Sequence, residues 1–176
     1  MFWVFTNIVN RRFKTMENKT NKLVTASLLA ALVCIATMII KIPLPTKGYL
    51  NLGDCIILFS AWTLSPMYGF LAAGIGSALA DLFAGYVVYA PVTFVVKGLM
   101  AIIAYYGYKI LNKRIGKLAS RIISGSVAEV EMVAGYFLFE GILYGFGASV
   151  VNVFANGIQG IFGVVLGVIL FKMLKR

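Results

Sequence analysis

Ionisable and amide side chains lie inside long apolar stretches of this 176-residue chain. An ionised group is costly in hydrocarbon, so each such residue marks a candidate functional site. Asn152, Asn156 and Gln159 are spaced by four and by three residues, which places their amides on one face of a helix. Such groups either hold a small polar ligand or neutralise one another. The ionisable candidates are Asp54, Asp81, Lys97, Glu129, Glu131 and Glu140.

Several kinds of chemistry are excluded by residue type. The sequence contains no histidine, so Ser–His or Cys–His catalysis and histidine-ligated metals are ruled out. Cys34 and Cys55 both lie in apolar runs, so we expect neither a disulfide framework nor a CxxC metal site. No G-x-x-x-x-G-K-S/T phosphate loop occurs, so the chain alone is not expected to hydrolyse ATP. We expect a binding protein that is not an enzyme and uses no metal or cofactor.

The elements that position these groups are expected to be membrane spans. Hydrophobic residues make up 61% of the chain and charged residues 12%, whereas a soluble domain is about half apolar and a quarter charged. A soluble enzyme is therefore excluded, and so is a nucleic-acid binder, despite the net charge of +10. The length allows one all-α domain of about six spans. The expected spans are residues 23–40, 52–64, 68–83, 92–108, 122–146 and 149–171.

Basic residues fall on one side of this six-span layout. They precede the first span, fill residues 109–121 and follow the sixth span, whereas Lys41 and Lys47 lie on the other side. Because cytoplasmic loops carry the excess of Lys and Arg, we expect both termini in the cytoplasm, in a bacterial cell membrane. Residues 1–22 then form a cytoplasmic segment, 23–171 the membrane domain and 172–176 a basic tail. We expect residues 1–15 to be either an extension from an upstream start or an interfacial segment.

Polar groups from five of the spans reach the same outer depth in this layout. Glu129 and Glu131 are the exception, since we expect them at cytoplasmic helix ends with no ligand role. A few convergent hydrogen-bonding groups among aromatic walls are typical of a pocket for a small, ring-bearing ligand. The tyrosines expected at that end are Tyr49, Tyr86, Tyr89, Tyr136 and Tyr144.

Each polar residue taken alone has a plainer explanation. Asp54 in a first helical turn caps the helix and meets its positive dipole end, and Asp81 and Lys97 neutralise each other. The tyrosines form an ordinary interfacial belt, and Asn156 with Gln159 joins neighbouring helices. These alternatives stay open, but they explain the shared depth poorly.

Small residues form a stripe on the first span. Ala26 and Ala30 are four residues apart, and Ser27 and Ala31 repeat that spacing one residue on. Such spacing lets another helix approach closely, either inside the bundle or as an external docking surface, and we favour docking. A pocket without an ATP-hydrolysing motif then indicates a subunit that captures a solute and leaves the energy-consuming step to partners.

An ordered set of motifs resembles the S-components of energy-coupling factor (ECF) vitamin transporters. The resemblance covers residues 22–171 and is nearest to the riboflavin and vitamin B6/hydroxymethylpyrimidine branch. The motifs are Lys41-Ile-Pro-Leu-Pro, Gly48-Tyr-Leu-Asn-Leu-Gly-Asp54, Ser65-Pro66 with Gly69, Gly74-x-Gly-Ser-x-x-x-Asp81, Gly85-Tyr-x-x-Tyr-Ala-Pro-x-Thr93-x-x-x-Lys97, Ala134-Gly-Tyr-Phe-x-x-Glu140 and Asn156-x-x-Gln159.

The resemblance implies a six-helix bundle that binds a vitamin from outside, under the first extracellular loop. It also implies partners, namely a transmembrane coupling subunit and two ATPase subunits, with Ala26, Ala30, Ser27 and Ala31 on the docking face. The substrate-binding residues expected from the pocket and the resemblance together are Tyr49, Asn51, Asp54, Asp81, Tyr86, Tyr89, Thr93, Lys97, Tyr136, Glu140, Tyr144, Asn152, Asn156 and Gln159.

Pyridoxine or pyridoxal is the expected cargo, because carboxylates, a lysine and amides around tyrosines suit a small hydroxylated heteroaromatic ring. Hydroxymethylpyrimidine and riboflavin are the alternatives within the family. Outside it, the chain would be a membrane assembly protein, a stand-alone uniporter, or an intramembrane enzyme that relies on paired carboxylates such as Asp54 and Asp81.

Overall fold

Six helices and one short β-ribbon make up the described part of a computed structural model, which covers residues 19–39, 42–43 and 49–174. The helices are α2 (Lys19–Ile39), α3 (Gly53–Thr63), α4 (Pro66–Phe83), α5 (Ala90–Ile115), α6 (Lys117–Tyr144) and α7 (Phe146–Leu174). Strand β1 (Ile42–Pro43) pairs antiparallel with β2 (Tyr49–Leu50). The predicted α-helical class is confirmed. The N-terminal segment through residue 18, Lys41 and Lys47 lie outside the described residues.

Proline and glycine set the helix boundaries. Pro66 and Pro91 lie in the first turns of α4 and α5, where a missing N–H breaks no helical hydrogen bond. Gly116 and Gly145 have φ angles of 83° and 89°, in the left-handed region that favours glycine. They separate α5 from α6 and α6 from α7.

The fourth and fifth predicted spans are longer than expected, because the basic residues 109–121 are helical except at Gly116. Lysine and arginine are good helix formers, so the helices continue past the apolar runs that defined the predicted spans. Charge marks where an apolar run ends, but it does not end a helix.

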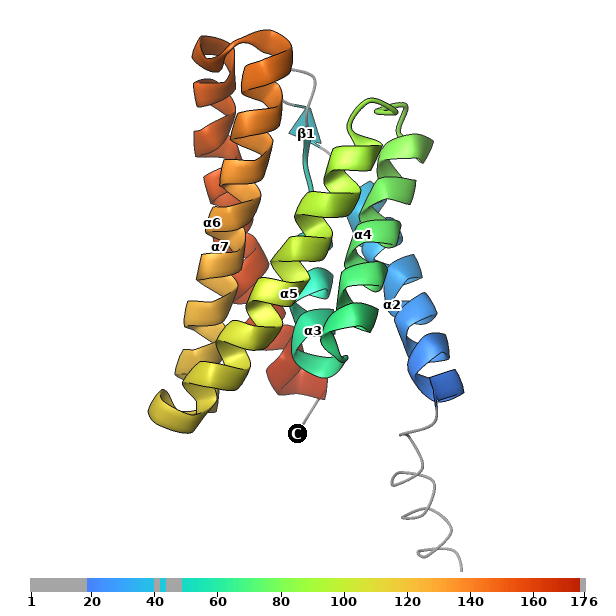
Figure 1. The fold of residues 1–176 in the computed structure, drawn as a ribbon, viewed down its shortest axis with the longest axis vertical. Coiled ribbons are helices and arrows are strands. Elements are labelled where there is room, and N and C mark those ends of the chain that lie inside the picture. The colour runs from blue at the N-terminus through green and yellow to red at the C-terminus, as the bar shows by residue number, and fades with distance from the viewer. Residues whose placement is uncertain (1–18, 40–41, 44–48, 175–176) are drawn as a thin grey trace, which may run out of the picture.

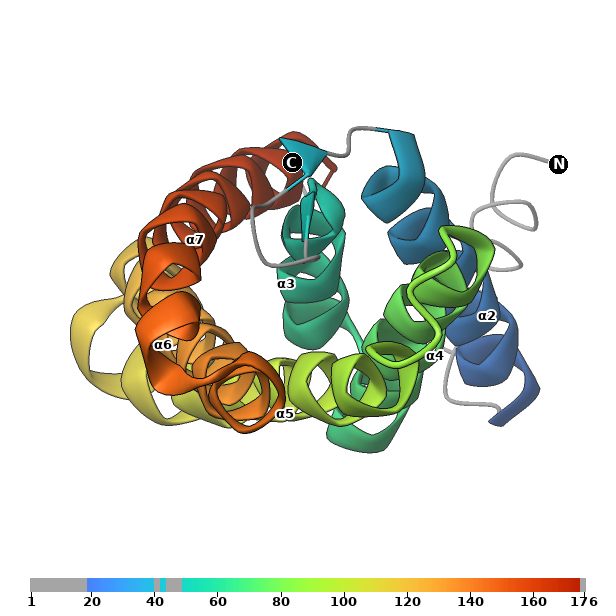
Figure 2. The ribbon, with the colours of Figure 1, turned by 90° about the horizontal axis from the view of Figure 1, so that it is seen from above.

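The five long helices form an open ring around the short helix α3 (Figure 2). Neighbours in the ring follow the order α2, α4, α5, α6, α7, and α3 contacts α2, α4, α5 and α7. Ile57 and Leu58 of α3 are fully buried and share a core with Met100 and Met132. Helix α3 therefore packs on protein, whereas side chains such as Ile142 and Phe154 are exposed on the outside of the ring.

Within the described residues, five helices are long and apolar enough to cross a membrane: α2, α4, α5, α6 and α7. Helix α3 has 11 residues, or about 16 Å at 1.5 Å per residue, roughly half of the 30 Å hydrocarbon core. Six helices are present where six spans are predicted, but α3 alone is too short to be a span. The start of α2 and the end of α7 lie at the same end of the bundle (Figure 1). Their cytoplasmic location stays a prediction.

Helices α2 and α4 cross at Gly76 of α4. A Cβ atom at this position would collide with the Ala30 carbonyl oxygen and would lie 2.8 Å from the Val33 Cβ. Only glycine allows this close approach, because the obstacle on α2 includes backbone, which cannot rotate away.

We predict that Gly76→Ala destabilises the fold, since overpacking costs about 1–3 kcal/mol. The apparent melting temperature of the detergent-purified variant measures this effect. Gly157→Ala is the matched control, because nothing lies within 4 Å of an added Cβ there. Equal stability of the two variants would contradict the close crossing.

Candidate functional site

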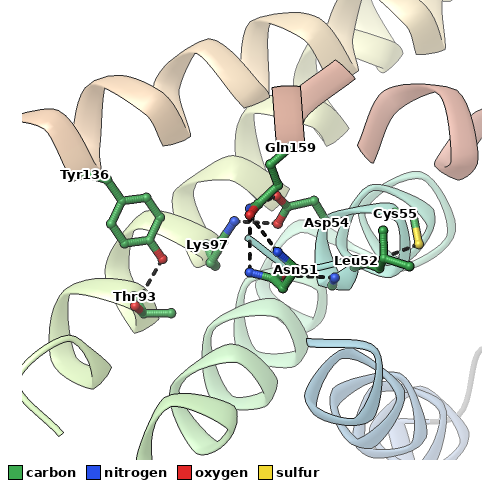
Figure 3. Close-up of polar contacts among 9 residues, drawn as sticks. Asn51, Leu52, Asp54, Cys55, Thr93, Lys97, Tyr136 and Gln159 are labelled. Atoms are coloured by element: carbon green, nitrogen blue, oxygen red, sulfur yellow. Dashed lines mark hydrogen bonds and ion pairs between the residues drawn. The ribbon is translucent and has the colours of Figure 1, made fainter. Parts of the chain in front are cut away.

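A buried ion pair occupies the centre of the bundle. Lys97 of α5 donates to Asp54 in the first turn of α3, and the two side chains are only 3% and 1% exposed. Gln159 of α7 donates through its side-chain N–H to the other Asp54 oxygen at 2.5 Å. The three groups converge from three helices (Figure 3). Because both carboxylate oxygens have partners, the buried charges are compensated as such groups require.

Asn51 connects this centre to the start of α3. Its backbone N–H donates to the Gln159 side-chain oxygen at 2.9 Å, and its own side-chain oxygen accepts from the Gly53 N–H at 2.8 Å. Asp54 lies in the first turn of α3, where its charge also meets the positive end of the helix dipole. Its side-chain hydrogen bonds are made to Lys97 of α5 and Gln159 of α7, so Asp54 does more than stabilise its own helix.

A second network surrounds Glu140 of α6. Its two carboxylate oxygens accept from the Tyr89 hydroxyl at 3.4 Å and from the Asn152 amide at 2.9 Å. Burial and the nearby Glu140 raise the pKa of Tyr89, so this hydroxyl stays protonated and acts as a donor. The Tyr136 hydroxyl donates to Thr93 at 3.0 Å and joins α6 to α5 (Figure 3).

Between the two networks lies a small polar cavity that is partly open to the outside of the protein. Side chains from every described helix except α3 reach it. The lining residues are Thr37, Asn51, Ser77, Asp81, Tyr86, Tyr89, Thr93, Lys97, Tyr136, Glu140, Asn156 and Gln159.

Most of the predicted binding residues line this one cavity. Asp54 and Asn152 lie one layer behind it, where they orient Lys97 and Glu140. Tyr144, the last residue of α6, is not among the lining residues, and the side chain of Tyr49 lies outside the described residues. The structure thus brings the predicted residues together, while their contact with a ligand stays a prediction.

Sequence reasoning missed Thr37 and Ser77, and it placed Glu129 wrongly. Thr37 and Ser77 line the cavity from α2 and α4, but a hydroxyl in an apolar helix gives no pattern that separates it from a packing residue. Glu129, expected at a helix end, is 5% exposed and packs against Gly160 and Gly163. A Cβ at Gly163 would also lie 2.9 Å from the Asp54 Cβ, so this carboxyl belongs to the layer beneath the ion pair.

A larger groove runs between α6 and α7, lined mainly by apolar side chains such as Val130, Phe154 and Ile161. These three side chains are exposed on the outside of the ring. Such a surface suits lipid chains, whereas the cavity has the convergent polar groups of a specific site. Among the described residues, no group of three or more His, Cys, Asp or Glu side chains could hold a metal ion.

The small residues of α2 divide between two environments. Ala26 is buried with Leu29 and Ala72, and Ala30 is partly buried against that cluster. Ser27 and Ala31 are exposed. Part of the stripe therefore packs inside the bundle, and the exposed pair is the part that remains available for docking.

Comparison with known proteins identifies the family. The model for "ECF-type riboflavin transporter, S component" matches residues 17–176. The chain belongs to the ECF S-component family. Its members are substrate-binding transporter subunits and not enzymes, so the chain is a multi-pass cell membrane protein whose family implies a vitamin substrate and ECF module partners.

Individual relatives match most of the chain. An uncharacterized protein of Pyrococcus woesei is 36% identical over 82% of this chain and 95% of the relative. The thiamine precursor transporter HmpT of Lactococcus lactis is 27% identical over 93% of each chain. The solved S component of a bacterial ECF transporter superposes with a TM-score of 0.66 over 90% of this chain and 97% of that chain. At 22% identity this last match supports the fold alone.

We predict that Lys97→Met destabilises the S-component, because it leaves Asp54 as an uncompensated buried charge. Removal of one partner of a buried pair costs about 3–5 kcal/mol. The double variant Asp54→Asn/Lys97→Met, which removes both charges, should recover much of the loss in apparent melting temperature. If the double variant loses as much stability as Lys97→Met and Asp54→Asn lose in sum, the ion pair is not what holds α3 to α5.

Proposed function

We propose that this S-component captures hydroxymethylpyrimidine, the pyrimidine precursor of thiamine, at the cavity end of the bundle. That end faces the outside of the cell, and the cargo passes inward with an ECF coupling subunit and two ATPases. Ser27 and Ala31 present the small-residue surface of α2 to the coupling subunit. Support comes from the L. lactis relative, which is described as a thiamine precursor transporter and matches over nearly the full chain.

The choice of ligand rests on the hydrogen bonding of the Asn156 side chain. Its side chain lines the cavity and is buried, yet it takes part in none of the hydrogen bonds among the described residues. A carboxamide offers one acceptor beside one donor group. The amino group and adjacent ring nitrogen of an aminopyrimidine offer the complementary pair, so Asn156 can bind this edge with two parallel hydrogen bonds.

The charges of the cavity agree with an electron-poor ring that carries donors. Asp81 and Glu140 are the acidic lining residues described, and Lys97, the one basic lining residue described, has its charge compensated by Asp54. An aminopyrimidine donates hydrogen bonds and accepts a proton readily, and both properties suit carboxylates. The acidic ring hydroxyl of pyridoxine suits them less well.

Riboflavin is the second candidate, because the matching family model is described by that vitamin. Pyridoxine or pyridoxal, favoured from the sequence, stays a prediction, and none of the relatives reported above is described as a vitamin B6 carrier. All three molecules are small heteroaromatic vitamins or precursors, so a single binding assay separates them.

We expect hydroxymethylpyrimidine to raise the apparent melting temperature of the detergent-purified chain more than riboflavin or pyridoxine does. A ligand at a hundredfold excess over its dissociation constant adds about 2.7 kcal/mol to stability. A shift with riboflavin alone would keep vitamin capture and replace the cargo. No shift with any vitamin, for folded protein, would reject the proposal.

We also predict that Asn156→Ala weakens hydroxymethylpyrimidine binding about tenfold or more in isothermal titration calorimetry, since two hydrogen bonds are worth about 1.4 kcal/mol or more. Ser149→Ala is the matched control, because this buried α7 hydroxyl donates to the Phe137 carbonyl and does not line the cavity. Equal affinities for the two variants would remove Asn156 from the site.

A further inference from the structure

Two buried hydroxyls on the cavity wall formed by α2 and α4 have no hydrogen-bond partner. Thr37 is 4% exposed and Ser77 is 2% exposed, and their side-chain oxygens bond to no other group in the part of the chain that the structure describes. A buried hydroxyl left without a partner costs about 1–3 kcal/mol. Both residues line the cavity, so a ligand there is positioned to supply the missing bonds.

Three other helical hydroxyls behave differently. Thr25, Ser60 and Thr63 each donate to the carbonyl four residues earlier, at 2.8, 2.7 and 2.7 Å. This local bond is the usual way for Ser and Thr to satisfy themselves in an apolar helix. Thr37 and Ser77 have the same option and do not use it, although no other described side chain bonds them instead.

The α2–α4 wall is held firmly in place. Ser77 follows Gly76, where α4 lies close against Ala30 and Val33 of α2, and Thr37 lies one turn beyond Val33. The Thr37 hydroxyl also lies against Gly53, next to the Asn51 side-chain oxygen. Two hydroxyls on a closely packed wall are preorganised, so little conformational entropy is lost when a ligand bonds them.

The opposite wall is already hydrogen-bonded. Glu140 accepts from Tyr89 and Asn152, and Thr93 accepts from Tyr136. The neutral groups that can still bond a ligand are therefore Asn156 on α7 and, across the cavity, Thr37 on α2 and Ser77 on α4. A hydroxyl group both donates and accepts, and so matches a hydroxyl on the ligand.

We infer that Thr37 and Ser77 are specificity-determining residues that bind the hydroxyl substituent of the cargo, while Asn156 binds the edge of its ring. This inference rests on the proposed function, and under it the substituent is the hydroxymethyl group of the pyrimidine. The two hydroxyls select for cargo that carries an alcohol and against the same ring with a methyl group in its place.

The test compares two ligands on several variants. Hydroxymethylpyrimidine and 4-amino-2,5-dimethylpyrimidine, which lacks only the hydroxyl, are titrated calorimetrically against wild type, Thr37→Val, Ser77→Ala and the double variant. Each single variant should weaken binding of the alcohol about three- to tenfold and leave the methyl analogue unchanged. If wild type binds riboflavin instead, the matched pair is riboflavin and lumiflavin, which keeps the ring and carries a methyl group in place of the ribityl chain.

Stability without ligand supplies a second readout. Thr37→Val and Ser77→Ala remove unsatisfied buried hydroxyls, so the apparent melting temperature should stay the same or rise. Ser60→Ala, the matched control, removes a hydroxyl bonded to its own helix and should leave the preference between the two ligands unchanged. A merely structural role for Thr37 and Ser77 would instead lower the melting temperature and weaken both ligands equally.

The outcomes separate the two proposals. If wild type binds no vitamin or precursor, the proposed function fails, and this inference with it. If wild type binds the alcohol more tightly than the methyl analogue but the variants keep that preference, the inference alone is wrong. Loss of the preference in Thr37→Val and Ser77→Ala, but not in Ser60→Ala, supports it.

Discussion

The buried ion pair between Lys97 and Asp54 is the interaction on which the rest of the structure depends. It attaches the short helix α3 to α5, and Gln159 extends the attachment to α7 and to the Asn51 backbone. Helix α3 is too short to span the membrane, so its position inside the ring depends on such contacts together with Ile57 and Leu58. The same lysine lines the cavity, so the charge pair that fixes α3 also forms part of the binding site.

This arrangement explains why one bundle can be both apolar and selective. Outside the ring, exposed aliphatic and aromatic side chains face the lipid. Inside, the networks around Asp54 and Glu140 satisfy their own charged groups. What remains for a ligand is a set of mostly neutral groups with the Asp81 carboxylate beside them, and neutral groups can be desolvated at lower cost than charges.

The sequence was sufficient to predict the helical class, most boundaries and the gathering of polar residues. Hydrophobic runs, proline and glycine are local signals, and intramembrane charges such as Lys97 and Glu140 are rare enough to stand out. Pairing was harder to predict. Asp81 was the suggested partner of Lys97, whereas the structure pairs Lys97 with Asp54, because relative helix rotation depends on tertiary packing that no local pattern encodes.

Hydroxyl groups and the burial of Glu129 mark the other limit of sequence reasoning. Thr37 and Ser77 resemble the packing residues around them, and only the absence of a bond to their own helix distinguishes them. Glu129 was expected at a helix end, because the apolar run around it is interrupted, yet close approach at Gly160 and Gly163 buries it. The position of Glu129 thus depends on close packing against two glycines, and such contacts between helices cannot be read from the sequence.

The most direct test of the central claim is an experimental structure of the chain purified with hydroxymethylpyrimidine. The account predicts ligand density in the polar cavity, with the ring edge on Asn156 and the hydroxymethyl group toward Thr37 and Ser77. Density in the apolar groove between α6 and α7, or a cavity left unchanged at saturating ligand, would contradict it.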